Sequence, residues 1–156
     1  MCMKSVNITT VFVEDDLSNI AEGIVFDRQI SRIKAEKNNN GENTVKLNIV
    51  TLLNAMSSDE DPDLTNVYDI MWTFGCLKDD EFYNQNIGFT VFDTAKCKIN
   101  NEKVSLRQFT NERRKLVLNH FVIDTLGTYY LKVYIKKADT EQKWQIQYIN
   151  SIEICE

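Results

Sequence analysis

The sequence predicts an all-β protein, an antiparallel β-sandwich of eight or nine strands with at most one or two short helical turns. Apolar and polar residues alternate over several runs, most clearly at residues 67–76 and 128–135, and this period of two indicates strands that bury one face. Turn-forming residues separate these runs at short intervals, a spacing that fits an antiparallel sheet better than the regular crossover helices of an α/β sheet. At 156 residues, the chain is long enough for a single domain with one continuous core.

The last third of the chain carries the strongest strand pattern. Residues 128–135 place four apolar side chains on one face: Tyr129, Leu131, Val133 and Ile135. Residues 143–154 alternate again after a short polar connector, so the two runs predict an antiparallel hairpin. Gly127 suits a tight turn before the first run. Together with residues 116–124, these runs predict a meander of three successive strands that forms much of one sheet.

This ending resembles a known kind of sandwich. An apolar strand, a turn with glycine and the run TYYLKVYI at residues 128–135 are similar to the closing strands of immunoglobulin-like and C2-like sandwiches. The resemblance covers about a quarter of the chain, and it lacks the Cys–Trp–Cys arrangement of a true immunoglobulin domain. It therefore implies a type of sandwich and no particular activity.

The first part of the chain contributes three further predicted strands. Residues 6–13 place four side chains on one face: Val6, Ile8, Thr10 and Phe12. Residues 16–23 fit a short helical turn, and residues 24–37 fit a strand or a helix almost equally, of which we choose the strand. After a break at residues 38–43, residues 44–56 predict a strand that is buried more fully near its end.

A loop and a core strand follow. Residues 57–66 predict a loop, because they are rich in acids and hold the only proline, which lacks a backbone donor. Residues 67–76 predict a strand with five side chains toward the core: Tyr68, Ile70, Trp72, Phe74 and Cys76. We interpret residues 78–86 as a polar connector, residues 97–106 as a short hairpin and residues 109–115 as a helical turn or an exposed loop.

The strand predicted at residues 87–93 leaves two patterns open. In a regular strand, three apolar side chains point inward: Ile87, Phe89 and Val91. If a β-bulge intervenes, Phe92 points inward instead.

Charge is distributed unevenly along the chain. The net charge is −5 and the sequence pI is about 5.0, which disfavours nucleic acid as a partner. Residues 57–93 hold nine acids and one base, whereas residues 96–137 hold ten bases and three acids. Two outcomes are open: the asymmetry produces an acidic and a basic patch, which act on solubility and partner choice, or the sheet interleaves the two segments and blurs both patches.

The motifs of common enzyme classes are absent from the sequence. It contains no G-x-S-x-G, P-loop, G-x-G-x-x-G or H-E-x-x-H motif. The only histidine, His120, has no nucleophile motif near it, so we interpret it as structural or surface-exposed. A hydrolase that uses Cys76 or Cys97 with His120 is the least favoured class. We expect no enzymatic activity and no cofactor.

The four cysteines and the first residues of the chain indicate the cellular compartment in which we expect the protein. Cys2, Cys76, Cys97 and Cys155 are scattered without a C-x-x-C pair, and we expect free thiols rather than disulfides. The first residues lack the apolar stretch and the cleavage site of a signal peptide, and no window is apolar enough for a transmembrane helix. We therefore expect a cytoplasmic protein that does not contact a membrane.

One acidic loop carries carboxylate oxygens, which are ligands that calcium prefers. It holds Asp59, Glu60, Asp61 and Asp63, and a second cluster that would have to complete the site holds Asp79, Asp80 and Glu81. The spacing differs from that of an EF-hand. We favour a solvated acidic loop over a metal site.

The candidate partner-binding residues are of two kinds. The aromatic set lies on or near the strand face opposite the expected core: Tyr130, Tyr134, Trp144 and Tyr148. The basic set precedes the last meander: Arg107, Arg113 and Arg114. Tyrosine, tryptophan and arginine are enriched at interfaces. Two alternatives remain, since another segment can cover the aromatic face and a charged loop can merely protect a sheet edge.

These observations favour a non-enzymatic protein-binding module whose partner is another protein or a second copy of the chain. The Asn-, Lys- and Ile-rich composition is typical of AT-rich bacterial or phage genomes, where an accessory regulator of this size would fit. The alternative is a structural subunit of a larger self-assembly, such as a virion or tail.

Overall fold

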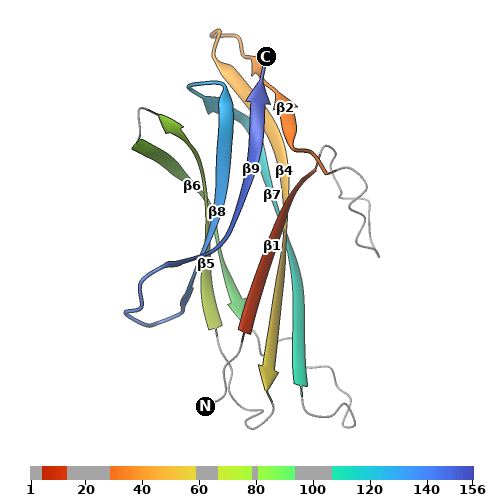
Figure 1. The fold of residues 1–156 in the computed structure, drawn as a ribbon, viewed down its shortest axis with the longest axis vertical. Helices are drawn as coiled ribbons and strands as arrows, with labels where there is room; N and C mark the ends of the chain where they lie inside the picture. Colours follow the sequence, from red (N-terminus) through yellow and green to blue (C-terminus); the bar gives the residue numbers. More distant parts are fainter. Residues whose placement is uncertain (1–4, 14–28, 59–66, 79–80, 94–106) are drawn as a thin grey trace.

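The computed structural model describes residues 5–13, 29–58, 67–78, 81–93 and 107–156, which form nine strands and no helix. Figure 1 shows the strands as two sheets that face each other. The predicted all-β sandwich is therefore confirmed. In the described part of the chain, no helix is long and apolar enough to cross a membrane.

The four-stranded sheet is built around one long strand, β4 (Asn43–Ser58). β1 (Ser5–Val13) and β3 (Glu36–Lys37) pair with one edge of β4, and β7 (Arg107–Ile123) pairs with its other edge. All three pairings are antiparallel. The prediction of strands at residues 6–13 and 44–56 is confirmed.

The five-stranded sheet has the order β2, β9, β8, β5, β6. Its strands are β2 (Arg32–Lys34), β9 (Gln145–Cys155), β8 (Gly127–Lys137), β5 (Val67–Lys78) and β6 (Glu81–Asp93). The pairing of β2 with β9 is parallel and the others are antiparallel. With β1, β4 and β7 in the opposite sheet, this order matches that of strands A, B, E and G, F, C, C′ in an immunoglobulin-like sandwich.

The predicted meander is correct for one of its two pairings. β8 and β9 form the expected hairpin. The strand expected beside them at residues 116–124 belongs instead to β7, which pairs with β4 in the other sheet. The chain crosses between the sheets at residues 124–126. Alternation predicts that a strand has one apolar face to bury. It does not say in which sheet the strand lies, because the inner faces of both sheets border the core.

The core lies between the two sheets and is filled from both inner faces. The prediction for residues 67–76 is confirmed, because Ile70, Trp72 and Phe74 are each at most 2% exposed. The Trp72 Nε1–H donates a hydrogen bond to Oγ1 of Thr51, with a donor–acceptor distance of 3.0 Å. This bond joins the two sheets and satisfies the one polar atom of the largest core side chain.

The segment predicted as a strand at residues 24–37 connects the two sheets. Its described part contains β2 and β3, which pair with β9 and β4 respectively. Between them, the Ala35 N–H donates to the carbonyl of Cys155 at 2.8 Å. The predicted helical turn at residues 16–23 lies outside the described residues.

Two segments predicted as irregular are strands. The connector predicted at residues 78–86 is wrong for most of its length, since β6 begins at Glu81. The loop or helical turn predicted at residues 109–115 is wrong because these residues pair continuously with β4. Polar residues form strands there because β4 supplies the backbone hydrogen bonds, whatever the side chains. Ser57 and Ser58 end β4, while residues 59–66 and 97–106 lie outside the described residues.

Candidate interaction surface

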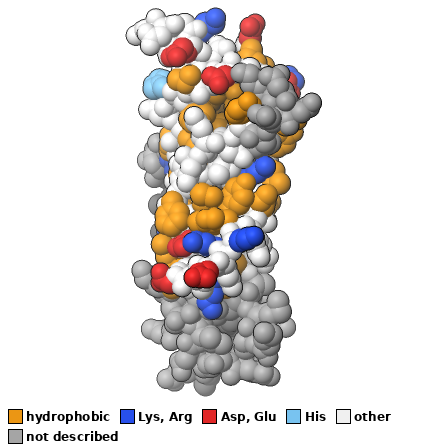
Figure 2. Space-filling model, turned by 90° about the vertical axis from the view of Figure 1, so that its left-hand side faces the viewer, with side chains coloured by type: hydrophobic (Ala, Val, Ile, Leu, Met, Phe, Trp, Pro, Cys, Tyr) orange, Lys and Arg blue, Asp and Glu red, His pale blue; other side chains and the backbone are white. Residues whose placement is uncertain are grey.

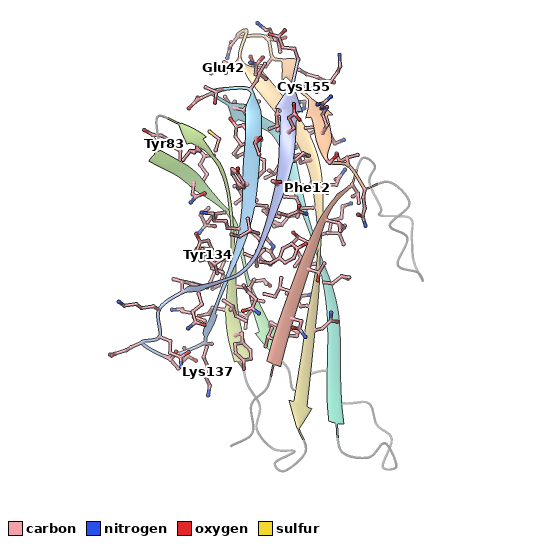
Figure 3. The ribbon with its side chains drawn as sticks, in the orientation of Figure 1. Phe12, Glu42, Tyr83, Tyr134, Lys137 and Cys155 are labelled. Carbon is pink, nitrogen blue, oxygen red and sulfur yellow. The ribbon has the colours of Figure 1, made fainter. Side chains whose placement is uncertain are left out.

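The outer face of the five-stranded sheet centres on β8. Its residues alternate between full burial on the inner face and partial exposure on the outer face. Tyr130 and Tyr134 lie on the outer face, as predicted from their spacing, and Lys132 and Lys136 lie between and beside them. Figure 3 shows Tyr134 on the outer side of β8, whereas Phe12 lies between the two sheets.

A β-bulge in β6 turns two apolar side chains outward. The register shifts between the pairs Trp72–Gly88 and Thr73–Asn86, so Ile87 is the extra residue. Phe92 is fully buried, whereas Phe89 is 57% exposed and Val91 is 46% exposed. Of the two patterns that the sequence left open, the bulged one is therefore correct. The inward orientation of Phe89 and Val91 is wrong, and Ile87 packs against the core.

A second β-bulge, in β9, has the same effect on the other side of β8. The register shifts between the pairs Val133–Tyr148 and Tyr134–Ile146, so Gln147 is the extra residue. Ile146 is 49% exposed on the outer side of this bulge. Tyr148 faces inward and packs against the core, so it does not share a face with Tyr134.

The two bulges flank the β5–β8 pair at the same height, because Trp72 is the β5 partner of Val133. Immediately beside them, four side chains are paired in one row across the sheet: Ile146, Tyr134, Met71 and Phe89. We define this row, together with Trp144 and Ile149, as the outer stripe. Ile149 is 52% exposed. Figure 2 shows a band of hydrophobic side chains across this side of the molecule.

Trp144 is held on the outer stripe by two ring contacts. Its ring meets that of Phe89 edge-on, with centroids 6.3 Å apart and an interplanar angle of 83°. The Lys136 Nζ lies 5.1 Å from the centroid of the Trp144 ring and 3.9 Å from Oδ2 of Asp69. Phe89 belongs to β6, three strands from β9. The contact therefore places the connector between β8 and β9 across the outer face.

The predicted basic residues lie on the other sheet. All three arginines belong to β7 and pair with the C-terminal half of β4: Arg107, Arg113 and Arg114. Arg114 is partly buried. The structure therefore separates the basic set from Tyr130, Tyr134 and Trp144, and the two sets do not form one surface.

His120 occupies a third irregular position. Asn119 and His120 stand opposite Lys46, between the pairs Val45–Phe121 and Leu47–Leu118. His120 is exposed, with a φ of 51°, in the left-handed region where histidine is one of the enriched side chains. This geometry gives the residue a backbone role in the bulge.

Two of the four cysteines lie among the described residues. Cys76 and Cys155 are free thiols, and the Cys76 Sγ lies 3.8 Å from the Thr125 Oγ1. Within the described ranges, no three His, Cys, Asp or Glu side chains are grouped so as to hold a metal ion. Cys2, Cys97 and the acidic loop at residues 59–63 lie outside those ranges.

The sequence prediction missed four members of the outer stripe: Met71, Phe89, Ile146 and Ile149. The sequence contained a signal that two of the strands, β6 and β9, carry apolar side chains on both faces. Val91–Phe92 and Tyr148–Ile149 are pairs of adjacent large apolar residues within otherwise alternating runs. Such a pair in a strand puts one apolar side chain on each face, whichever face is buried.

Comparisons with known proteins add little to this geometry. No protein-family model matches the chain, and no curated protein matches it. One solved structure, β-glucosidase from Listeria innocua in complex with isofagomine, is similar at 7% sequence identity with a TM-score of 0.45. The match covers 97% of this chain and 16% of the β-glucosidase chain. A likeness at this level carries no argument about activity.

Proposed function

We propose that this protein is a non-enzymatic binding module that docks a partner protein through the outer stripe. The observation that carries the proposal is the pair of β-bulges, which turn Phe89 and Ile146 outward on both sides of the β5–β8 pair. Bulges commonly re-aim side chains at functional positions. Here they gather apolar side chains at the centre of a sheet face.

The composition of the outer stripe supports docking. Contiguous exposed apolar patches mark interaction sites on soluble proteins, and aromatic residues and methionine are enriched at such sites. Phe89, Ile146 and Ile149 are each about half exposed. Covering them would be favourable by about 25 cal/mol for each Å² of apolar surface removed from water. The setting that the composition favours is an accessory regulator in the cytoplasm of a bacterium or a phage-infected cell.

A second candidate is a structural subunit of a self-assembly. The feature that favours it is the pair of edge strands, β6 and β7. Among the described residues, no strand pairs with the outer edge of either one. Unpaired edges can accept strands from another copy of the chain, and repeated pairing would extend the assembly.

The test of docking is affinity purification of the tagged chain from a lysate of its native host, followed by mass spectrometry. The stripe variant combines Phe89→Ser with Ile146→Ser. The control combines Val117→Ser with Val122→Ser, two valines of β7 that are each 46% exposed on the other sheet. We expect one stoichiometric partner with the wild type and the control, and at least an about tenfold loss with the stripe variant, because a few central side chains dominate binding energy.

Equal recovery of the partner with the stripe variant and with the control variant would show that the outer stripe is not part of the interface. Recovery of the chain alone, in complexes larger than a monomer, would favour the structural subunit instead.

A further inference from the structure

A basic cleft opens beside the outer stripe. It has a volume of about 400 Å³ and lies between β1 and the end of the β8–β9 hairpin. Three lysines line it, Lys136, Lys137 and Lys143, together with the glutamines Gln142, Gln145 and Gln147. No acidic side chain is among the described residues that line it. We call this feature the lysine cleft.

The lysine cleft and the outer stripe are two sides of one segment. Along residues 143–147, Lys143, Gln145 and Gln147 line the cleft, whereas Trp144 and Ile146 belong to the stripe. Lys136 reaches both, since it lines the cleft and its Nζ lies 5.1 Å from the centroid of the Trp144 ring. A ligand long enough to cover Trp144 and Ile146 would therefore also reach the lysines.

Among the described residues, the first half of β9 has a strand partner on one edge only, that of β8. On the edge of β9 that faces away from β8, the neighbouring strand is β2. β2 pairs only with residues 153–155 of β9. Nearer its start, β9 is tied to β1 by side chains, with Gln147 Nε2 donating to the Val6 carbonyl at 2.9 Å and Asn150 Nδ2 donating to the Thr10 carbonyl at 3.0 Å. Among the described residues, no strand pairs with this edge of β9 at residues 145–150.

The charge of the cleft selects its ligand. The whole chain has a net charge of −5, yet three lysines and no carboxylate are among the described residues that line the cleft. Because the Lys136 Nζ already lies 3.9 Å from Oδ2 of Asp69, the positive charge offered to a ligand comes from Lys137 and Lys143. An anionic group that enters the cleft is attracted by both of these ammonium groups. The side-chain amides of Gln142 and Gln145 can also donate hydrogen bonds to an anionic oxygen.

We propose that the lysine cleft binds the carboxylates of an extended segment of the partner protein, in which acidic residues alternate with large apolar residues. In a strand laid along the open edge of β9, successive side chains point to opposite sides. The apolar side chains would then cover the outer stripe while the carboxylates enter the cleft. This inference rests on the proposed docking function and names the chemistry of the partner.

The two tryptophans provide a reporter and an internal control for a binding experiment. Trp144 lies on the outer stripe, whereas Trp72 is 2% exposed in the core and donates its indole N–H to Thr51. In a ¹⁵N-labelled sample of the full chain, each gives one indole N–H resonance. A ligand of the stripe and cleft shifts the Trp144 resonance and leaves that of Trp72 unchanged.

The probe is a synthetic peptide of alternating leucine and glutamate, and its matched control replaces every glutamate with glutamine. We expect the glutamate peptide to shift the Trp144 resonance and to bind at least about tenfold more tightly than the glutamine peptide. We also expect the variant Lys137→Glu with Lys143→Glu to weaken its binding about tenfold. A variant with the same change in net charge elsewhere, Lys34→Glu with Lys46→Glu, should bind like the wild type, because distant exposed charges are screened by salt.

Equal affinities for the two peptides would overturn the inference, as would equal weakening by the two lysine variants. Polyglutamate that binds as tightly as the alternating peptide would show a general anion site and would also overturn it. Purification of the partner with the same variants separates this failure from failure of the docking proposal. Capture that needs Phe89 and Ile146 but not Lys137 and Lys143 leaves docking intact, whereas capture that needs neither pair contradicts docking itself.

Discussion

The inner and outer faces of the five-stranded sheet are both apolar at their centre, and they differ in what covers them. On β8, Leu131 and Val133 have no exposed surface, because the four-stranded sheet packs on them. On the opposite face, Phe89 and Ile146 lie at the same height with about half of their surface in water. An apolar strand face is therefore a surface that can be buried, and the presence of a second layer of structure decides whether it is buried.

The faces also differ in how their side chains are held. Inner side chains interlock with those of β4 and β1 in one continuous cluster. On the outer face, the Trp144 ring contacts Phe89 and Lys136 of the same sheet. We therefore expect substitutions to act on stability at the inner face and on binding at the outer face.

The largest expected effect is that of a truncation in the core. Leu131→Ala removes a fully buried side chain from the centre of β8 and should lower the free energy of unfolding by about 2–5 kcal/mol, because it loses apolar burial and leaves a cavity. Urea denaturation followed by circular dichroism measures the change. The matched variant is Ile149→Ala on the outer stripe, where the side chain is 52% exposed. Its effect should stay within about 0.5 kcal/mol. An equal loss of stability at both positions would show that the outer face stabilises the fold as much as the core does.

A smaller effect is expected for the hydrogen bond that joins the two sheets. Thr51→Val keeps the shape of the side chain but removes the acceptor of the Trp72 indole N–H. Both residues are buried, so the N–H would lose its partner in the core, and the free energy of unfolding should fall by about 1–3 kcal/mol. Thr51→Ser, which retains a hydroxyl, is the control and should recover part of that loss. An unchanged stability in Thr51→Val would show that the indole finds another acceptor.

The smallest effect concerns two inward-facing tyrosines at high pH. Burial raises the pKa of Tyr68 and Tyr129 above 10.0. In the unfolded chain these phenols ionise first, so the folded state holds more protons and its stability falls as the pH rises. Their contribution is therefore fully present below pH 10.0 and is lost as the pH rises through the folded values above it.

The variants Tyr68→Phe and Tyr129→Phe isolate this contribution. Each should reduce the slope of unfolding free energy against pH above pH 10.0, as measured by urea denaturation at a series of pH values. The slopes are compared rather than the absolute stabilities, because Tyr129→Phe also removes the hydrogen bond that the Tyr129 hydroxyl donates to the Thr125 carbonyl at 2.8 Å. Slopes equal to that of the wild type would show that neither phenol is shielded from water.

Much of the fold was predictable from local patterns. The alternation of residues 6–13, 67–76 and 128–135 identifies three strands and the face that each buries. The outward position of Tyr130 and Tyr134 follows from the same alternation. A period of two is a property of the single strand, and it holds whatever strand lies beside it.

Other features depended on which segments meet in space. β7 could be recognised in part as a strand, but its place beside β4 was set by packing between the sheets. The two bulges arose where β6 and β9 fit their register to the β5–β8 pair, and pairing between segments distant in sequence is not encoded in either run alone. The sequence by itself determined the sandwich class, the core strands and the aromatic face of β8. The tertiary structure alone decided that the arginines lie on the other sheet, that Tyr148 faces the core and that Phe89 and Ile146 complete the outer stripe, because a surface is made by neighbouring strands whose register only the folded chain sets.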